Sequence, residues 1–477
     1  MSSKIKIFEY DINGRDALPS REYIISENGV AAKRIFSSKS QQQSSSSPTE
    51  WLQHYFISAP SRVMSDLFLP LGYPQSVGAE YMQYQICDSI QGLCSYLRGV
   101  VSTSAVLTAA GVGNAEATAM SAAMTWAMRD GLGMMGGLTF SYWTSSLYDA
   151  HVKEFRLFAD IINDVGLTLD MLAPYTASEN VLYITSLAMI CKVMCGISAG
   201  ATKGSITQHF CKKGNMADLN AKEGTQETLV SLLGMLLGIA LAKYLHIIEK
   251  EDKSMATIVS WTIFNVLTLV HIYVNYVGVR VLRLRTLNQE RTKVLFEGVI
   301  NVVAKQCVDN STNQDSATKA LFSLPSPENV NESLFNSTVT LLFPRNIQLG
   351  VRIGKALQNL STSDTKTLLD NEFKEEHYVV TIQKSKQIYS TLRVGACEID
   401  ELKAFLHVLV ISRCQTLGIK LSDMELINQT HLRLNALFEG STCLSLEVLG
   451  RKGWDVSNRL FLGFGHCRFQ DSLSKAD

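Results

Sequence analysis

The sequence predicts a mainly α-helical protein, in which a Gly- and Ala-rich, membrane-embedded helical bundle precedes a small α+β domain. Only 18% of the 477 residues are charged, whereas soluble domains carry about a quarter. Charged residues return beyond residue 340, where two paired strand-like segments (377–383 and 388–395) are followed by two helix-like segments (398–414 and 423–440) and a closing strand-like segment (460–470). Before residue 340, five spans contain no charged residue: 99–115, 117–128, 131–148, 228–242 and 254–279.

Charge and cysteine content exclude several classes of protein. Lys and Arg number 44 and Asp and Glu number 44, so the net charge is +0, which argues against a nucleic-acid partner. The ten cysteines include no C-x-x-C pair and no histidine at a zinc-finger distance, so we expect no metal site and no disulfide framework. They are typical of reduced thiols in a cytosol-like compartment.

The N-terminal 50 residues differ from the rest. They lack the pattern of a signal peptide and are too acidic for a transit peptide, so we expect neither secretion nor a location in the plastid stroma, and which membrane holds the protein stays open. A Ser/Gln run at 37–47 has no apolar periodicity. We therefore expect a disordered tail over 1–50, a helical domain over 51–295, an Asn/Ser-rich linker over 296–339 and an α+β domain over 340–477.

The best transmembrane candidate is 254–279, which exceeds the roughly 20 residues needed to cross a bilayer as a helix. Basic residues are distributed unequally around it. Lys250 and Lys253 precede it among three acidic residues, whereas a larger group follows it: Arg280, Arg283, Arg285, Arg291 and Lys293. This excess predicts that the C-terminal domain faces the cytosol.

Two glycine patterns indicate close helix packing. Gly234 and Gly238 form a G-x-x-x-G pair within an apolar stretch, a spacing that lets two helix backbones approach. GLGMMG at 131–136 also matches a dinucleotide-binding pattern, but the residues before it are Ala/Met-rich and helical rather than strand-like. We therefore interpret both patterns as packing faces.

Isolated charged residues in the apolar region are candidate site residues. Arg129 and Asp130 stand between two charge-free spans, either as a paired or functional charge within a membrane or as a solvated loop at its surface. Arg156, Asp160 and Asp164 share one face of a predicted amphipathic helix over 151–170. That face is interpreted either as a solvated surface with a modest ion pair or as part of a site.

Two further candidates lie near the last two charge-free spans. Residues 215–227 are polar and immediately precede an apolar helix, where acidic residues are favoured by the helix dipole or form a polar site at the helix mouth. His271 and Asn275 lie four residues apart within 254–279, as hydrogen-bonding partners for another helix or as a ligand or proton site. The candidates in the polar segment are Lys222, Glu223, Gln226 and Glu227.

Taken in order, several motifs resemble those of the root UV-B sensitive (RUS) family over about residues 51–295. They lie at 68–91, 111–136, 153–166, 198–210, 215–230 and 279–291. The Trp-Asp-Ser that is usual in the family appears here as Cys87, Asp88 and Ser89, and Asp88 joins the candidate ligand- or partner-binding residues. From about residue 340 the resemblance is loose.

The resemblance implies a membrane protein connected with UV-B perception in roots, seedling development, auxin transport or vitamin B6 homeostasis. It implies no established reaction, and the sequence has no nucleophile triad, metal motif or phosphate-binding loop. We therefore expect no catalytic or metal-binding residue and leave the cofactor and the small-molecule ligand unassigned. Expected partners are a lipid bilayer and an oligomer of RUS proteins, either homo- or hetero-oligomeric.

Two functional hypotheses follow. The first is a membrane-associated scaffold or component that handles or transports a small molecule, without catalysis. The second is a soluble or peripheral vitamin-binding regulator or enzyme, whose apolar helices form a large core. Retention of the chain in carbonate-washed membranes distinguishes the two.

Overall fold

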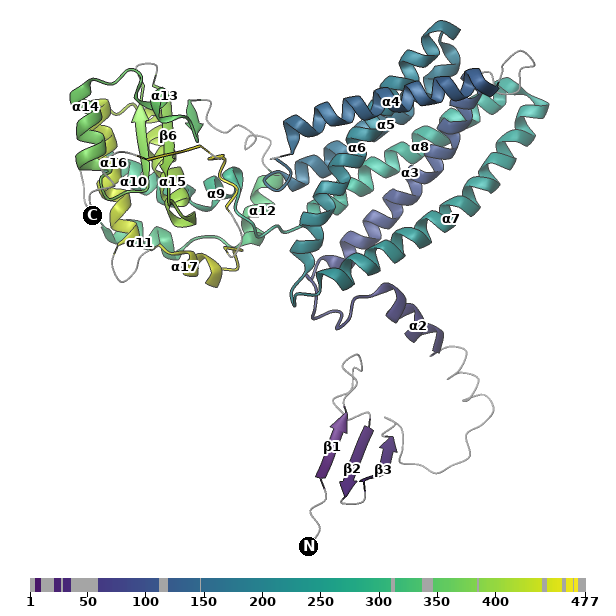
Figure 1. Cartoon of the computed structure of the whole chain (residues 1–477), viewed down its shortest axis with the longest axis horizontal. Coiled ribbons are helices and arrows are strands. Elements are labelled where there is room, and N and C mark those ends of the chain that lie inside the picture. Colours follow the sequence, from purple (N-terminus) through teal and green to yellow (C-terminus); the bar gives the residue numbers. More distant parts are fainter. Residues whose placement is uncertain are drawn as a thin grey trace. The chain divides into compact units, whose positions relative to one another are not determined.

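The computed structural model of the chain divides into two units (Figure 1). The helical unit comprises Met1–Trp143 and Lys153–Leu282, and the C-terminal unit comprises Thr144–Val152 and Arg283–Asp477. The structure describes the following residues: 5–9, 21–26, 29–35, 59–110, 119–145, 147–309, 314–336, 346–383, 386–439, 444–456, 460–465 and 467–470.

Three antiparallel strands lie within the first 50 residues: β1 (Ile5–Glu9), β2 (Arg21–Ser26) and β3 (Gly29–Ile35). The register pairs apolar residues across the two strands, Ile5 with Ile25 and Ile7 with Tyr23. This differs from the disordered tail expected over 1–50, because that expectation rested on the Ser/Gln run at 37–47. The run itself lies outside the described residues.

Long helices make up most of the helical unit and lie side by side (Figure 1). Helix α3 packs along both α7 and α8, and α7 packs on α8. The helices are α2 (Ala59–Phe68), α3 (Tyr81–Ala109), α4 (Ala119–Thr144), α5 (Val152–Leu172), α6 (Val181–Phe210), α7 (Met216–Glu251) and α8 (Lys253–Val281). The predicted helical bundle is confirmed.

A single residue separates α7 from α8. Asp252 has an extended backbone that ends α7, and its carboxylate accepts hydrogen bonds from the backbone N–H groups of Ser254 (2.8 Å) and Met255 (3.2 Å). An aspartate at this position satisfies backbone donors that a helix start leaves free. The chain therefore turns from α7 into α8 without a loop.

Glycines bring the helices into close contact, as their spacing predicts. A Cβ at Gly234 would lie 2.8 Å from Cγ of Tyr96, and one at Gly238 would lie 2.9 Å from a methyl carbon of Val100 on α3. The GLGMMG segment lies inside α4, where a Cβ at Gly136 would lie 2.9 Å from Ile190 on α6. Both glycine patterns are thus helix-packing faces.

The C-terminal unit is the predicted α+β domain. Its strands are β4 (Ile347–Leu349), β5 (Tyr378–Ile382), β6 (Ile388–Arg393) and β7 (Arg468–Phe469), with β6 paired to each of the others. Its helices are α9 (Gln289–Leu295), α10 (Glu297–Val308), α11 (Gln314–Phe322), α12 (Pro327–Asn336), α13 (Ile353–Leu357), α14 (Thr362–Thr367), α15 (Glu398–Thr416), α16 (Asp423–Phe438) and α17 (Leu446–Arg451).

A large apolar core holds this unit together. Helix α15 packs on β5, β6, α10 and α16, and its residues from Leu402 to Ile411 are almost entirely buried. Helices α10, α11 and α12 lie where we expected a linker over 296–339. Val299, Val303 and Leu321 are buried in the same core, because apolar residues at helical spacing accompany the Asn and Ser residues that indicated a linker.

Candidate functional site

In the helical unit, several charged and amide side chains are buried between the helices, while many large apolar side chains are exposed. Leu236 on α7 is 55% exposed, and Leu138 on α4 and Leu269 on α8 are 74% and 69% exposed. By contrast, charged and amide side chains are buried between the helices: Gln85, Gln91, Arg98, Asp160, Asp164, Asp170, Glu223, His271 and Asn275. This is the reverse of the arrangement in a soluble domain.

Helix α5 shows the inversion directly. Asp160 and Asp164 are 5% and 6% exposed, whereas Ile161 and Val165 on the other face are 54% and 43% exposed. The interpretation of the charged face as a solvated surface is therefore wrong. Periodicity identifies two faces of a helix correctly, but it does not say which one is buried.

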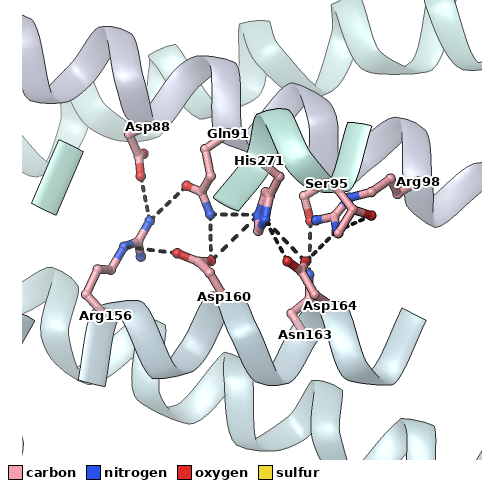
Figure 2. A network of polar contacts seen from close by, with 10 residues as sticks. Asp88, Gln91, Ser95, Arg98, Arg156, Asp160, Asn163, Asp164 and His271 are labelled. Atoms are coloured by element: carbon pink, nitrogen blue, oxygen red, sulfur yellow. Dashed lines mark hydrogen bonds and ion pairs between the residues drawn. The ribbon is translucent and has the colours of Figure 1, made fainter. Parts of the chain in front are cut away.

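Arg156 links two helices at one end of the buried polar network (Figure 2). Its Nη2 donates hydrogen bonds to Asp88 Oδ1 (2.5 Å) and to Gln91 Oε1 (3.3 Å), both on α3. Its Nε lies 4.0 Å from Asp160 Oδ2, one turn along α5. The guanidinium thus lies between carboxylates from two helices.

Gln91 connects this end of the network to His271 (Figure 2). Because its Oε1 accepts from Arg156, its Nε2 is the donor, to Asp160 Oδ1 (2.6 Å) and to His271 Nε2 (3.2 Å). His271 Nε2 is therefore an acceptor, and the proton of a neutral ring lies on Nδ1, 3.3 Å from Asp164 Oδ2. The hydrogen bonds are mutually consistent with a neutral His271.

The deepest part of the network is an ion pair between Arg98 on α3 and Asp164 on α5. The Arg98 side chain is fully buried, and its Nη1 also donates to the Thr268 hydroxyl on α8 (3.3 Å). Its Nε and Nη2 have no hydrogen-bond partner among the described residues. Burying the two charges costs desolvation free energy, which their mutual attraction offsets. If one member is lost, the other charge stays buried without its partner.

A second group of polar residues surrounds Glu223 on α7. One carboxylate oxygen accepts from Gln85 Nε2 on α3 (3.1 Å), and the other accepts from the Thr207 hydroxyl on α6 (2.8 Å). One turn further along α7, Glu227 pairs with Lys203 Nζ at 2.5 Å. Three helices therefore contribute to the environment of these carboxylates.

A pocket of about 460 Å³ lies where the two groups meet, between α3, α5, α6 and α7. Its volume is within the range of small-molecule sites. Its lining combines charged, polar and small side chains: Gln85, Asp88, Ser89, Gln91, Gly92, Ser95, Tyr96, Arg156, Asp160, Asn163, Cys195, Ala199, Glu223, Gln226, Glu227, Val230 and Ser231. We take this pocket as the candidate site.

The pocket brings together half of the residues singled out from the sequence. Those lining it are Asp88, Arg156, Asp160, Glu223, Gln226 and Glu227. Asp164 and His271 lie in the adjoining network, and Asn275 is buried one turn after His271.

The other predicted residues lie elsewhere. Lys222 donates to the backbone carbonyl of Asp66, which fixes the segment before α3. Arg129 lies 3.7 Å from Asp130 on α4 and 4.5 Å above the ring of Trp126. These three residues therefore serve contacts outside the pocket.

Sequence analysis missed the contribution of α3. Gln91, Ser95 and Arg98 follow Asp88 at intervals of three, four and three residues, which places all four on one face of the helix. Ser95 accepts a hydrogen bond from Asn163 of α5 at 3.1 Å. A polar stripe at helical spacing within a charge-poor segment was the signal that could have identified them.

The C-terminal unit contains a separate buried polar cluster. Glu376 Oε1 accepts from Lys403 (2.5 Å), His431 (3.2 Å) and Asn435 (3.2 Å). Burial alone would raise the pKa of Glu376, but hydrogen bonds from His431 and Lys403 outweigh it and lower that pKa to about 2.

The neighbouring His407 is fully enclosed and lies 5.6 Å from His431, ring to ring. It bonds to the hydroxyls of Tyr378 (3.3 Å) and Thr430 (2.9 Å). Burial, together with the charge of His431, lowers the pKa of His407 well below its usual value. The members of this cluster bond to one another, and Asn435 Oδ1 is the cluster atom that has no hydrogen-bond partner among the described residues.

Fold and site together define a class: a helical protein with a polar interior and an apolar outer surface, joined to a separately cored α+β unit. Residues 57–302 match the family model described as "Vitamin B6 photo-protection and homoeostasis domain". Residues 323–462 match the one described as "Root UVB sensitive protein, C-terminal". The chain belongs to the root UVB sensitive family, which confirms the resemblance and extends it into the C-terminal unit.

Relatives are found in an amoeba and in a plant. The chain is 34% identical to RUS family member 1 of Dictyostelium discoideum, over 68% of this chain and 56% of the relative. It is 32% identical to protein root UVB sensitive 3 of Arabidopsis thaliana, over 81% of this chain and 83% of the relative. Protein root UVB sensitive 2 of that plant, named chloroplastic, is 30% identical over 48% of this chain and 50% of its own length. No solved structure matches the chain.

Proposed function

We propose that this chain is an integral membrane protein that binds a small molecule in the pocket of its helical unit and transports it or passes it on. The observation that carries the proposal is the combination of buried charges around the pocket with apolar outer faces on the surrounding helices. In water, both features would cost free energy. In a bilayer, the apolar faces are in their preferred solvent.

Helix lengths support a membrane location. Three helical segments are long and apolar enough to cross a bilayer: Ser178–Phe210, Met216–Glu251 and Lys253–Val281, with mean hydropathies of 1.8, 1.8 and 1.6. In the 18-residue stretch of each segment that gives this hydropathy, only 28%, 11% and 17% of the residues are buried within the protein. A core helix of a soluble protein would be mostly covered, so these helices need another apolar environment.

Exposed basic residues in the last turn of α8 and just after it support the proposed orientation. Arg280 and Arg283 are exposed, whereas Arg291 is buried and donates to the Thr286 backbone carbonyl. The exposed arginines support a cytosolic C-terminal unit. An oligomer with a second copy or another RUS protein belongs to the same proposal, since the outer faces of α4 and α7 offer apolar surface.

Vitamin B6 supplies the ligand hypothesis. The matched family model is described by vitamin B6 photo-protection and homoeostasis. Vitamin B6 compounds are small, polar molecules, and the 460 Å³ pocket has room and polar groups for one. We therefore propose a B6 compound or a close metabolite as the cargo, with binding and passage rather than covalent chemistry as the activity.

Two measurements test this function. Membranes containing the full chain are washed with alkaline carbonate, and we expect the intact chain to stay with the lipid. The detergent-purified chain is then examined for thermal stabilisation by pyridoxal, pyridoxine and pyridoxamine, because a ligand that binds the folded state raises the melting temperature. Release of the intact chain into the wash would favour the soluble or peripheral vitamin-binding regulator or enzyme instead.

A further inference from the structure

We infer that the pocket selects a positively charged amine and excludes phosphate esters. This rests on the proposed function and names the class of ligand. The inference comes from the balance of charges around the pocket, not from the number of carboxylates alone. Each charged group has to be matched with its partner before the net preference is known.

Two of the four pocket carboxylates have a cation of their own. Asp88 pairs with Arg156 at 2.5 Å, and Glu227 pairs with Lys203 at 2.5 Å. Arg156 also donates to Gln91, which further occupies its guanidinium. The positive charges near the pocket are therefore engaged by existing partners.

Glu223 and Asp160 are held by neutral donors instead. Glu223 accepts from an amide and a hydroxyl, and Asp160 accepts from the amide of Gln91. Both residues are 5% exposed. The nearest cation to Asp160 is the Arg156 Nε at 4.0 Å, beyond hydrogen-bond distance.

One oxygen of Asp160, which lies 4.0 Å from Arg156 Nε, is available to a hydrogen-bond donor in the pocket. Its Oδ2 is buried and has no hydrogen-bond partner among the described residues. Asp160 lines the pocket, and Asp88, Arg156 and Glu223 line it too. A buried acceptor left without a donor is costly, so an N–H donor entering the pocket would remove that cost.

The network behind the pocket supplies no surplus positive charge. Arg98 is paired with Asp164, and the hydrogen bonds of His271 are those of a neutral ring. Tyr96 of α3 adds an aromatic side chain to the lining. Carboxylates with an aromatic face are suited to an ammonium group.

A phosphate ester would meet the opposite situation. It brings two negative charges toward Asp160 and Glu223, and the cations that could receive it, Arg156 and Lys203, are already paired. A phosphate would have to share these cations with the carboxylates that they already pair with. The structure therefore favours the dephosphorylated amine over its phosphorylated counterpart.

Calorimetric titration of the full chain in lipid nanodiscs tests the inference with matched probes. Pyridoxamine and pyridoxamine 5′-phosphate differ only by the phosphate. Benzylamine and phenyl phosphate compare an amine with a phosphate ester in compounds unrelated to vitamin B6. We expect pyridoxamine to bind at least about tenfold more tightly than its phosphate. In Asp160→Asn and Glu223→Gln, amine affinity falls about tenfold or more, the scale of a lost charged hydrogen bond.

Two control variants separate this effect from a general change of charge. Glu249→Gln alters an exposed acid of α7 that lies outside the pocket, 3.9 Å from His246, and Asp130→Asn alters an acid of α4 outside the pocket. Both are expected to bind the amine within about twofold of wild type, as exposed ion pairs contribute little. A loss equal to that of Asp160→Asn in both controls would overturn the inference.

The remaining outcomes distinguish the inference from the proposed function. Tighter binding of either phosphate probe than of its amine partner overturns the selectivity, even if vitamin B6 is the cargo. Binding of benzylamine without any B6 compound supports the amine site and removes the vitamin from the proposed function. Failure of both amines to bind overturns the inference.

Discussion

The Arg98–Asp164 pair shows most clearly how single residues stabilise the helical unit. Arg98 is fully buried, and its partner comes from another helix, with Thr268 of a third helix completing the contact. A buried charge of this kind is tolerated only with its counter-charge. The pair therefore fixes α3, α5 and α8 relative to one another.

Replacing Arg98 by alanine is expected to destabilise the chain by about 3–5 kcal/mol, because Asp164 stays buried without its cation. The matched control is Arg283→Ala, which removes an exposed arginine paired with Glu328 at 3.0 Å and costs about 0–1 kcal/mol. Thermal unfolding of both variants in detergent measures the difference. Equal melting temperatures would show that the pair contributes nothing.

At the scale of elements, glycine positions determine how closely the helices pack. Gly136 of α4 faces Ile190, and Gly234 of α7 faces Tyr96, each with less room than a methyl group needs. Gly131 of α4, by contrast, has no atom within 4 Å of the position its Cβ would occupy. The same residue type thus has two different roles within one helix.

Gly136→Ala and Gly234→Ala are expected to lower stability by about 1–3 kcal/mol, since the added methyl forces neighbouring side chains away. Gly131→Ala is expected to be neutral or slightly stabilising, because alanine favours the helix and meets nothing. Melting temperatures of the three variants provide the comparison. A loss at Gly131 as large as at Gly136 would show that close packing against a neighbouring helix does not set the effect, since helix propensity favours alanine at both positions.

Elements were predictable where local pattern decides them. The α5 helix, the β5–β6 pair and the helices α15 and α16 all follow from residue periodicity, and so does glycine packing. Helices α10–α12 were not predicted, because the Asn and Ser residues of this segment indicated a linker although its apolar residues recur at helical spacing.

The candidate site was only partly predictable, because it is assembled from distant parts of the chain. Arg156 meets Asp88 across 68 positions, and Asp164 meets His271 across 107. No local pattern encodes such contacts. Arg129 and Lys222 looked equally promising in sequence, yet they lie outside the pocket because their helix faces point elsewhere.

At the scale of the whole molecule, the two units follow opposite rules. The C-terminal unit has a large apolar core, whereas in the helical unit charged side chains such as Arg98, Asp164 and Glu223 are buried beside apolar groups such as Val101, Leu167, Met171 and Phe264. Their stabilities should therefore respond to different conditions. Apolar burial and the Glu376 cluster stabilise one, and the membrane is proposed to stabilise the other.

Acid is expected to weaken the C-terminal unit through Glu376. The pKa of Glu376 is about 2 in the folded state, whereas the ordinary pKa of a glutamate, which applies to the unfolded state, is 4.5. The unfolded state therefore binds the proton more readily. The contribution is complete above about pH 4.5 and is lost as the pH falls toward 2. Allowing for solvent screening, it amounts to about 2 kcal/mol.

Pulse proteolysis of the full chain in urea, read from fragments of the C-terminal unit, measures this loss. Glu376→Gln should be less stable than wild type at pH 7 and show a smaller further loss in acid. Glu375→Gln, which changes the adjacent exposed glutamate, should keep the wild-type pH dependence. An unchanged acid response in Glu376→Gln would show that another group is responsible.

The central claim is that the outer faces of the helical unit meet lipid while its charged pocket is enclosed between helices. It is tested most directly by carbene footprinting of the chain in native membranes, with one lipid-soluble and one water-soluble reagent, followed by mass spectrometry. The account predicts that the lipid-soluble reagent labels the exposed apolar residues of α4, α7 and α8, including Leu138, Leu236 and Leu269. Labelling of these leucines by the water-soluble reagent alone would contradict it.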